Sequence, residues 1–369
     1  MSLYDQPVNM LPPYRVTLTV SILAETKDYN HELLNVPAMW KRTMGESVKV
    51  AILDTGLPHH VDLNPAGCLS FVPGYIDDAN GHGTHVAGIV AAIANNGMGV
   101  AGVAPKCLFY SGAVMDKSGS GTVDGIIQGI RWAVDEVGAK VINMSLGMPS
   151  GFPILKNLED VCNYAALNGV TVVCAAGNEA AGVGQPAVYD SVIAVAAVDC
   201  NKKRASFSDY GPEVDFAAGG VEVFSTWLNN GYAKLSGTSM ASPALAGVVT
   251  LILADEFAGT GKWLSKDEVY AKLRKIAYNV SGPVFDEYEG WGIPVFGNEG
   301  EPTQPEEPTK PEEPKACDCS LALPMAKQFL DAAVVELNKG RSMEEAVAEG
   351  MRATQMYTAR VAGVRARLK

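Results

Sequence analysis

The stretch Val48-Lys-Val-Ala-Ile-Leu-Asp-Thr-Gly56 joins an apolar, β-branched run to an acid and a turn-forming glycine, and runs of this kind recur along the chain. They recur at 108–114, 141–144, 170–174 and 191–198, with segments of helical period between them at 82–94, 122–137 and 154–167. Near-continuous apolar strands that alternate with helices are typical of a parallel sheet covered on both faces. The sequence therefore predicts a three-layer α/β fold, with a mainly parallel sheet flanked by helices.

Composition narrows the classes of partner. The 369 residues carry 41 Asp and Glu against 29 Lys and Arg, a formal charge of −12, which disfavours nucleic acid as a partner. The longest apolar runs, such as 244–254, are shorter than the roughly 20 residues that a bilayer requires, so no membrane association is expected. The first residues lack the pattern of an export signal, and seven cysteines are an odd number for a disulfide framework. We expect reduced cysteines and a cytoplasmic protein.

The chain divides into four parts by composition. Residues 1–36 form an N-terminal extension, and residues 37–296 carry the alternating pattern. In residues 297–320, a proline at every third position from 302 to 314 predicts a stiff polyproline linker rich in glutamate. Residues 321–369 read as a helical hairpin, with Ser342 and Glu345 in a capping box. Its apolar stripe is thin for a separate core, so we expect it to pack on a second copy of the chain, another partner or the main domain.

Four segments carry reactive side chains where strands end or helices begin. Asp54 closes the first strand, His82 opens a helix of small residues, and Ser239 opens a long apolar helix. Asn178 follows the strand 170–174. A serine becomes a nucleophile when an imidazole removes its proton and a carboxylate orients that imidazole, while an amide N–H can hold an oxyanion. Each motif alone is also an ordinary strand turn or helix cap, but their joint occurrence favours catalysis.

With these blocks in this order, residues 37–258 resemble the subtilisin-like (subtilase, S8) serine proteases, and in character the intracellular subtilisins. The resemblance implies a subtilisin-like fold and a serine endopeptidase with Asp54, His82 and Ser239 as its triad, Asn178 as oxyanion donor and no catalytic cofactor. His85 would be structural. Two departures concern local loops: Ala218-Gly219-Gly220 stands where the family commonly has Ala-Pro-Gly, and Ala244 where it often has histidine. The expected walls of the substrate groove for a peptide or protein substrate are Ser145, Leu146, Gly147, Ala175, Ala176 and Gly177.

The same resemblance implies a structural Ca²⁺ site in the loop that follows the His82 helix. Its ligands would be Asp62, Asn96, Met98 and Val100. The Asn96-Gly97 pair is equally typical of an ordinary turn, so both readings remain open.

The N-terminal extension contains Leu11-Pro-Pro-Tyr14, which resembles the short proline-containing segment of intracellular subtilisins. We expect it to lie in the cleft as an inhibitor, because proline has no N–H for strand pairing and fixes its φ angle. The alternative is an ordinary disordered start. Two other functions remain open: a catalytically silent module that binds peptides, and a self-processing assembly protein whose C-terminal helices carry the function.

Overall fold

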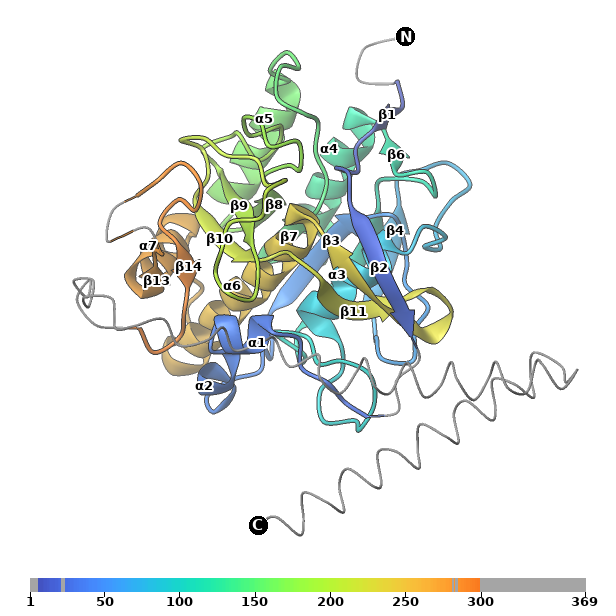
Figure 1. The fold of residues 1–369 in the computed structure, drawn as a ribbon. Coiled ribbons are helices and arrows are strands. Elements are labelled where there is room, and N and C mark those ends of the chain that lie inside the picture. Colours follow the sequence, from blue (N-terminus) through green and yellow to red (C-terminus); the bar gives the residue numbers. More distant parts are fainter. Residues whose placement is uncertain (1–5, 21–23, 281, 283–284, 299–369) are drawn as a thin grey trace, which may run out of the picture. The chain divides into compact units, whose positions relative to one another are not determined.

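The computed structural model describes residues 6–20, 24–280, 282 and 285–298. Its centre is a sheet of seven parallel strands in the order β10-β9-β8-β7-β3-β5-β4 (Figure 1). This confirms the predicted α/β class with a parallel sheet. The predicted linker and helical hairpin lie almost wholly outside the described residues. The strands are β3 (Lys49–Asp54), β4 (Gly67–Ser70), β5 (Leu108–Ala113), β7 (Val141–Met144), β8 (Thr171–Ala175), β9 (Val192–Val198) and β10 (Phe216–Gly219).

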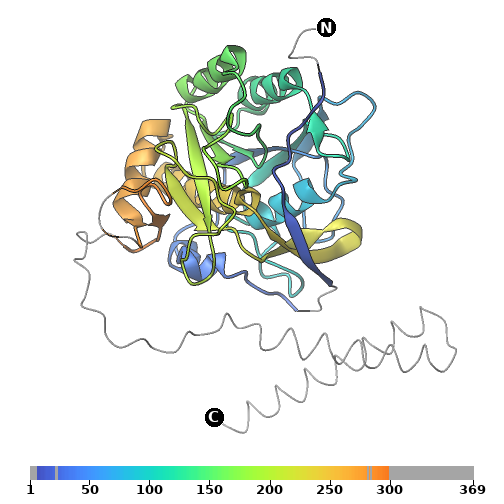
Figure 2. The ribbon, with the colours of Figure 1, turned by 45° about the horizontal axis from the view of Figure 1, so that its top comes forward.

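Helices cover both faces of this sheet (Figure 2). On one side α3 (His82–Ala91) packs against α6 (Thr238–Thr260), and α6 runs under β7, β8, β9 and β10. On the other side α4 (Val123–Trp132), followed by a π-helical turn at Ala133–Val137, packs against α5 (Lys156–Leu167). The remaining helices are α1 (Asn30–Leu33), α2 (Val36–Trp40), the short 3₁₀ turn Leu228–Asn230 and α7 (Lys266–Ile276).

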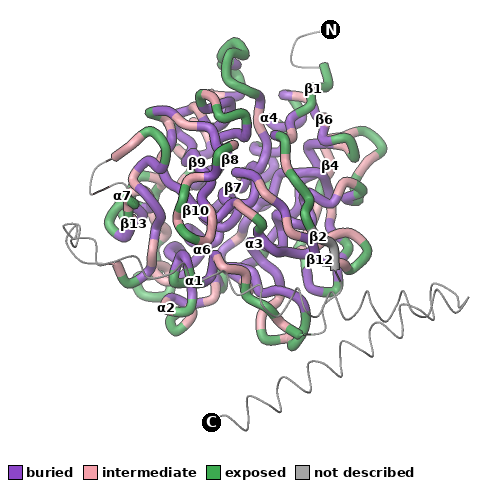
Figure 3. The backbone as a smooth tube through the Cα atoms, in the orientation of Figure 1, coloured by how far each residue is buried: buried purple, intermediate pink, exposed green. Residues whose placement is uncertain are grey.

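The residues of α3 and of most of α6 are buried against the sheet (Figure 3). All ten residues of α3 are buried, and α6 is buried without interruption from Thr238 to Ala254. Among the described residues α6 is the one helix long and apolar enough to cross a membrane, but 83% of that apolar stretch is buried inside the molecule. Its apolar character is therefore that of a central core helix, and its first turn is held rigidly below the carboxyl ends of the strands.

The N-terminal extension contributes strands of its own. β1 (Val8–Asn9) pairs antiparallel with β6 (Ser120–Gly121), and β2 (Arg15–Val20) pairs antiparallel with β12 (Gly231–Ser236). β12 also pairs with β11 (Val223–Trp227), so β2 completes a three-stranded sheet. A last pair, β13 (Ala277–Tyr278) and β14 (Ile293–Pro294), lies near α7. The extension is thus built into the fold, against the alternative of a disordered start.

The departure at Ala218-Gly219-Gly220 has a physical reason. The backbone N–H of Gly219 donates to Asn30 Oδ1 at 3.0 Å, and its carbonyl accepts from Asn30 Nδ2 at 3.1 Å. The Tyr29 hydroxyl lies against the same loop and accepts from the N–H of Val221. A Cβ atom at position 219 would lie 2.5 Å from both Tyr29 and Asn30. Glycine at 219 leaves the space that these two side chains fill.

The expectation that all cysteines are reduced is wrong at one position, since Cys200 is disulfide-bonded. Cys68, Cys107, Cys162 and Cys174 are free thiols. Burial raises the pKa of Cys107 and of Cys162 to about 12, which keeps both thiols protonated and unreactive at neutral pH.

Candidate active site

Asp54 and His82 meet at the carboxyl end of the sheet. Asp54 is the last residue of β3 and His82 the first of α3, so strand and helix bring together side chains 28 residues apart. His82 Nδ1 lies 2.8 Å from Asp54 Oδ1, and both side chains are buried. The same Asp54 oxygen accepts the N–H of Thr55 at 2.8 Å. This contact fixes the orientation of the imidazole ring and leaves its other nitrogen, Nε2, available for a second partner.

Ser239 is the second residue of α6, and its side chain is not hydrogen-bonded to His82. The Ser239 hydroxyl donates to the carbonyl oxygen of Ser145 at 3.3 Å. His82 Nε2 is buried and has no hydrogen-bond partner among the described residues. Of the two contacts that the predicted triad requires, the structure shows the one between Asp54 and His82, while the Ser239 hydroxyl is bonded to Ser145.

Asn178 is oriented by the start of α6. Its Oδ1 accepts both the backbone N–H and the hydroxyl of Thr238, each at 2.8 Å. With the oxygen occupied in this way, Nδ2 must point in the other direction, and it donates to the carbonyl oxygen of Pro13 at 2.8 Å. The Asn178 amide therefore donates to a peptide carbonyl oxygen, the type of contact that its predicted role requires.

The segment that supplies this carbonyl runs along one of the predicted walls of the substrate groove, at Gly147. The N–H of Met10 donates to Gly119 O at 3.0 Å, and Met10 O accepts from the N–H of Gly147 at 2.8 Å. The Met10 side chain is fully buried. Further along, the Tyr14 ring centre lies 5.0 Å from that of His82, and the Tyr14 hydroxyl donates to Asn80 Oδ1 at 3.2 Å. Burial, with the nearby Asp54 and Asp78, raises the pKa of Tyr14.

The residues predicted to form the walls of the substrate groove make different contacts. Of this set, Gly147 bonds the bound segment through its backbone, as strand addition requires. The Ser145 hydroxyl donates to Ser239 O at 2.9 Å and lies 3.0 Å from Ser242 Oγ, so this side chain secures the first turn of α6. Gly177 has a φ of +123°, and its N–H donates to Thr238 Oγ1. The other three predicted walls are buried: Leu146, Ala175 and Ala176.

His85 lies one turn after His82 and holds α3 to the neighbouring strands. Its Nε2 lies 3.1 Å from Val223 O and 3.0 Å from Ala233 O. Burial lowers the pKa of His85 to about 3, so the ring is neutral. These contacts support the structural role predicted for it.

Sequence reasoning missed Asp78, which organises the turn before His82. Its Oδ1 accepts from the Thr55 hydroxyl and the N–H of Gly81, at 2.9 and 2.8 Å. Its Oδ2 accepts from the N–H and hydroxyl of Thr84, at 2.7 and 2.6 Å. Asp78 thereby caps α3 and ties it to the end of β3. The available signal was an acid four residues before a helix-opening histidine.

The four residues predicted to bind calcium lie together. Asp62 is fully buried; one carboxylate oxygen accepts from Asn96 Nδ2, and the other from the N–H of Val100 at 2.9 Å and the Tyr232 hydroxyl at 3.3 Å. Asn96 Oδ1 accepts the N–H of Met98 at 3.0 Å. A carboxylate, an amide oxygen and loop carbonyls are the hard donors that Ca²⁺ prefers, and half a turn of the Asn96 amide would exchange its nitrogen for its oxygen. The described residues contain no group of three or more His, Cys, Asp or Glu side chains that could hold a metal.

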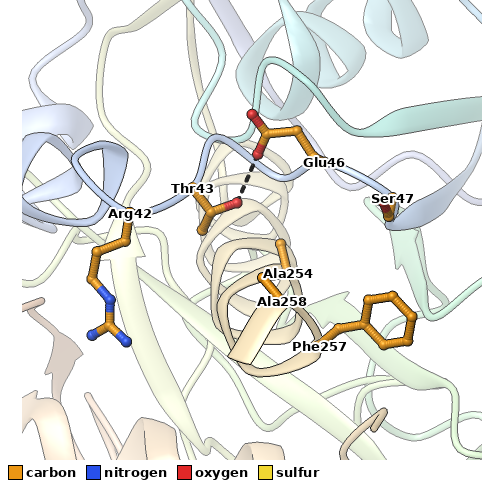
Figure 4. Close-up of a pocket in the computed structure, with 7 residues that line it drawn as sticks. All are labelled: Arg42, Thr43, Glu46, Ser47, Ala254, Phe257 and Ala258. Atoms are coloured by element: carbon orange, nitrogen blue, oxygen red, sulfur yellow. Dashed lines mark hydrogen bonds between the residues drawn. The ribbon is translucent and has the colours of Figure 1, made fainter. Parts of the chain in front are cut away.

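A cavity lies at a different place in the described part of the chain. It measures about 460 Å³, and its wall includes the far end of α6, with Ala254, Phe257 and Ala258 (Figure 4). At 1.5 Å per residue, Ala254 is about 22 Å along that helix from Ser239. The groove that holds residues 8–14 is therefore a separate feature from this cavity.

The comparisons with known proteins agree with this geometry. Residues 45–292 match the model of the subtilase family. The chain is 52% identical over 257 residues to subtilisin DY of Bacillus licheniformis, which covers 68% of this chain and 89% of that protein. It is 47% identical to the M-protease of Shouchella clausii (strain KSM-K16), covering 63% of this chain and 61% of that protein, and 47% identical to subtilisin Savinase of Lederbergia lenta, covering 62% and 85%. The chain therefore belongs to the subtilase family and is a serine endopeptidase of the subtilisin type.

Proposed function

We propose that the chain hydrolyses peptide bonds through an acyl-enzyme on Ser239, with His82 as general base and acid and Asp54 as the orienting acid. The observation that carries this assignment is the Asn178 amide, which is fixed by Thr238 and donates to a peptide carbonyl oxygen at 2.8 Å. A substrate carbonyl in the position of Pro13 O would meet the same donor when its oxygen becomes negative.

The proton movements follow from the contacts of His82. Its Nδ1 is engaged by Asp54, so the free Nε2 accepts the Ser239 proton once the hydroxyl turns from Ser145 O toward it. The serine oxygen attacks the carbonyl carbon, and His82 then gives the proton to the leaving amine. Water repeats the sequence to release the acyl group, and Asp54 stabilises the imidazolium in both halves.

Substituting the nucleophile tests the assignment directly. Ser239→Ala should lower the rate of peptide hydrolysis by several orders of magnitude, because the triad acts as a unit. A fluorophosphonate should label the wild-type protein at Ser239, and mass spectrometry locates the label. A wild-type protein that binds peptides but takes no label would instead be a silent binding module. Cleavage of itself but of no unrelated protein would favour the self-processing alternative.

We also infer that residues 8–14 inhibit the enzyme by occupying its groove. Three features support this: Pro13 O occupies the Asn178 amide donor, the Tyr14 ring lies against the His82 ring, and the Ser239 hydroxyl is turned to Ser145. Pro12 and Pro13 offer no N–H for the strand pairing that would align a bond for attack.

Met10→Asp in the full-length protein tests the inhibition. It places a carboxylate where a fully buried methionine lies, which should expel the segment and raise the initial rate on a peptide about tenfold or more. Asn9→Asp is the matched control, because Asn9 is exposed and its change should leave the rate unaltered. Freshly prepared proteins must be compared before any self-cleavage. Equal initial rates for Met10→Asp and wild type would contradict the inhibitory role.

We further propose calcium binding at the Asp62 loop, supported by the buried Asp62 carboxylate and by the Asn96 side-chain amide against it, which could turn its oxygen to the same place. Cytoplasmic localisation and an oligomer or partner contact through residues 321–369 remain predictions from the sequence.

A further inference from the structure

A second carboxyl group lies behind the oxyanion donor. Asp209, in the loop between β9 and β10, is 1% exposed. Its Oδ1 accepts the N–H of Glu179 at 2.9 Å and the N–H of Ala181 at 2.8 Å, and its own N–H donates to Gly177 O at 2.9 Å. One aspartate therefore holds both ends of the short loop that presents Asn178.

The other oxygen of Asp209 faces a second acid. Asp209 Oδ2 is buried and has no hydrogen-bond partner among the described residues. A Cβ atom built on Gly177 would meet Asp209 Oδ2 at 2.0 Å and Glu179 Oε2 at 3.1 Å, so both oxygens point to the same place beside Gly177. Glu179 Oε2 in turn accepts the N–H of Asn178 at 2.9 Å. The two carboxyl groups thus converge on the backbone of the oxyanion residue.

The loop they hold is conformationally demanding. Gly177 has a φ of +123°, and Ala180, which carries a Cβ, has a φ of +52°. A left-handed alanine is unfavourable and persists where the surroundings fix it. The Asp209 contacts on either side of Ala180 supply that restraint.

We propose that Asp209 is a positioning residue of the oxyanion hole, which in its protonated form donates from Oδ2 to the Glu179 carboxylate and so fixes the loop that carries Asn178. This role rests on the proposed catalytic function of Asn178. Loss of the proton leaves two facing carboxylates, whose repulsion loosens the loop.

The electrostatics agree with a proton held at this place. Burial raises the pKa of Asp209 to about 7, and the neighbouring Glu179 acts in the same direction. The N–H bonds from Ala181 and Glu179 oppose this rise. Arg204, in the same loop, directs its guanidinium to Ser208 O and to the rings of Tyr210 and Tyr288. The same loop also carries Asp199, Lys202 and Lys203 at its start and Glu213 and Asp215 at its end. Glu287 lies in the segment whose carbonyl oxygen accepts the N–H of Gly211.

The sign of the pH dependence follows. A carboxyl group whose pKa is raised in the folded state contributes stability below its unfolded value, near 4, and loses that contribution as pH rises through 7. The rate should therefore fall above about pH 7, as the Asp209 proton is lost.

The first experiment needs no activity and uses the full-length protein with Ser239→Ala, which prevents self-cleavage. The thermal midpoint is measured from pH 4 to 9 with and without Asp209→Asn. The asparagine side chain donates to Glu179 at every pH and still accepts both N–H groups through its oxygen. The parent protein, which keeps Asp209, should lose stability relative to the Asp209→Asn variant as pH rises toward 7. A difference between the two that does not change with pH would overturn the proposal.

The second experiment measures kcat and KM against pH in the full-length Met10→Asp protein. We expect kcat to fall about tenfold between pH 7 and 9, with KM little changed, and Asp209→Asn to abolish that fall. Glu179→Gln should abolish it too, and the double variant should behave like either single one. Asp190→Asn, an exposed acid elsewhere, is the matched control and should keep the fall. An unchanged profile in both Asp209→Asn and Glu179→Gln would overturn the proposal. Absence of any hydrolysis would overturn the proposed function instead, while the stability measurement still decides the role of Asp209.

Discussion

Asn178 shows how much of a catalytic residue's action depends on atoms that do not react. Its oxygen accepts two bonds from Thr238, and this leaves its nitrogen facing the groove. The donor is therefore oriented before any substrate arrives, and little reorganisation is needed when charge develops.

Removal of this donor should slow the reaction without weakening substrate binding. We expect Asn178→Ala to lower kcat about a hundred- to a thousandfold, a magnitude that comes from such a change in a subtilisin, with KM nearly unchanged. Steady-state kinetics on a peptide in the Met10→Asp protein measures both constants. A rise in KM with kcat unchanged would show that Asn178 binds the substrate in its ground state.

At this scale the sequence predicted the reactive residues but few of their supports. Asp54, His82, Ser239 and Asn178 were identifiable because each stands beside a distinctive small-residue motif. Asp78 and Asp209 were missed. The position of Asp78 four residues before the helix-opening histidine was a signal, but for neither acid does the sequence show which N–H groups surround the carboxylate. The Ser239 contact to Ser145 was equally inaccessible, because it depends on a side-chain rotation.

Among the elements, the segment before α1 is fastened by three consecutive residues. Asp28 Oδ2 accepts the N–H of Phe224 at 2.9 Å, Tyr29 contacts Val221, and Asn30 exchanges two bonds with Gly219. These bonds join the N-terminal segment to β10 and β11, elements about 190 residues later in the chain. Because Gly219 has no side chain, Tyr29 and Asn30 fit against it.

Filling that space should loosen the junction. We expect Gly219→Ala to destabilise the protein by about 1–3 kcal/mol, because its Cβ would lie 2.5 Å from Tyr29 and Asn30. Gly259→Ala is the control: that Cβ has no atom within 4 Å, and alanine should stabilise the α6 helix by about 1 kcal/mol. Urea unfolding of both variants in the Ser239→Ala protein gives the two free energies. Equal stability of Gly219→Ala and its parent would show that the junction yields without cost.

The elements themselves were largely predictable, and their partners less so. The five apolar runs became β3, β5, β7, β8 and β9, because strands buried on both faces need apolar residues throughout. β2 gave no comparable signal: it pairs with β12 from more than 200 residues away, and short strands of mixed polarity reveal their pairing only in the folded molecule.

For the whole molecule, calcium is the ligand with a testable effect on stability. A buried Asp62 carboxylate that binds Ca²⁺ in the folded state alone would stabilise it by about 2.7 kcal/mol at a concentration one hundred times the dissociation constant. We expect the thermal midpoint of the Ser239→Ala protein to rise by several degrees with calcium relative to chelator. Asp62→Asn should remove this difference, and identical midpoints in the parent protein would contradict the site.

The N-terminal strand has a further consequence for the enzyme after activation. While β2 is present, β12 is paired on both sides. Departure of β2 would leave β12 as an exposed sheet edge, with a row of unsatisfied N–H and C=O groups that ends three residues before Ser239. Such an edge is a template for another extended chain. A polypeptide substrate would then find in β12 the pairing edge that β2 covers here.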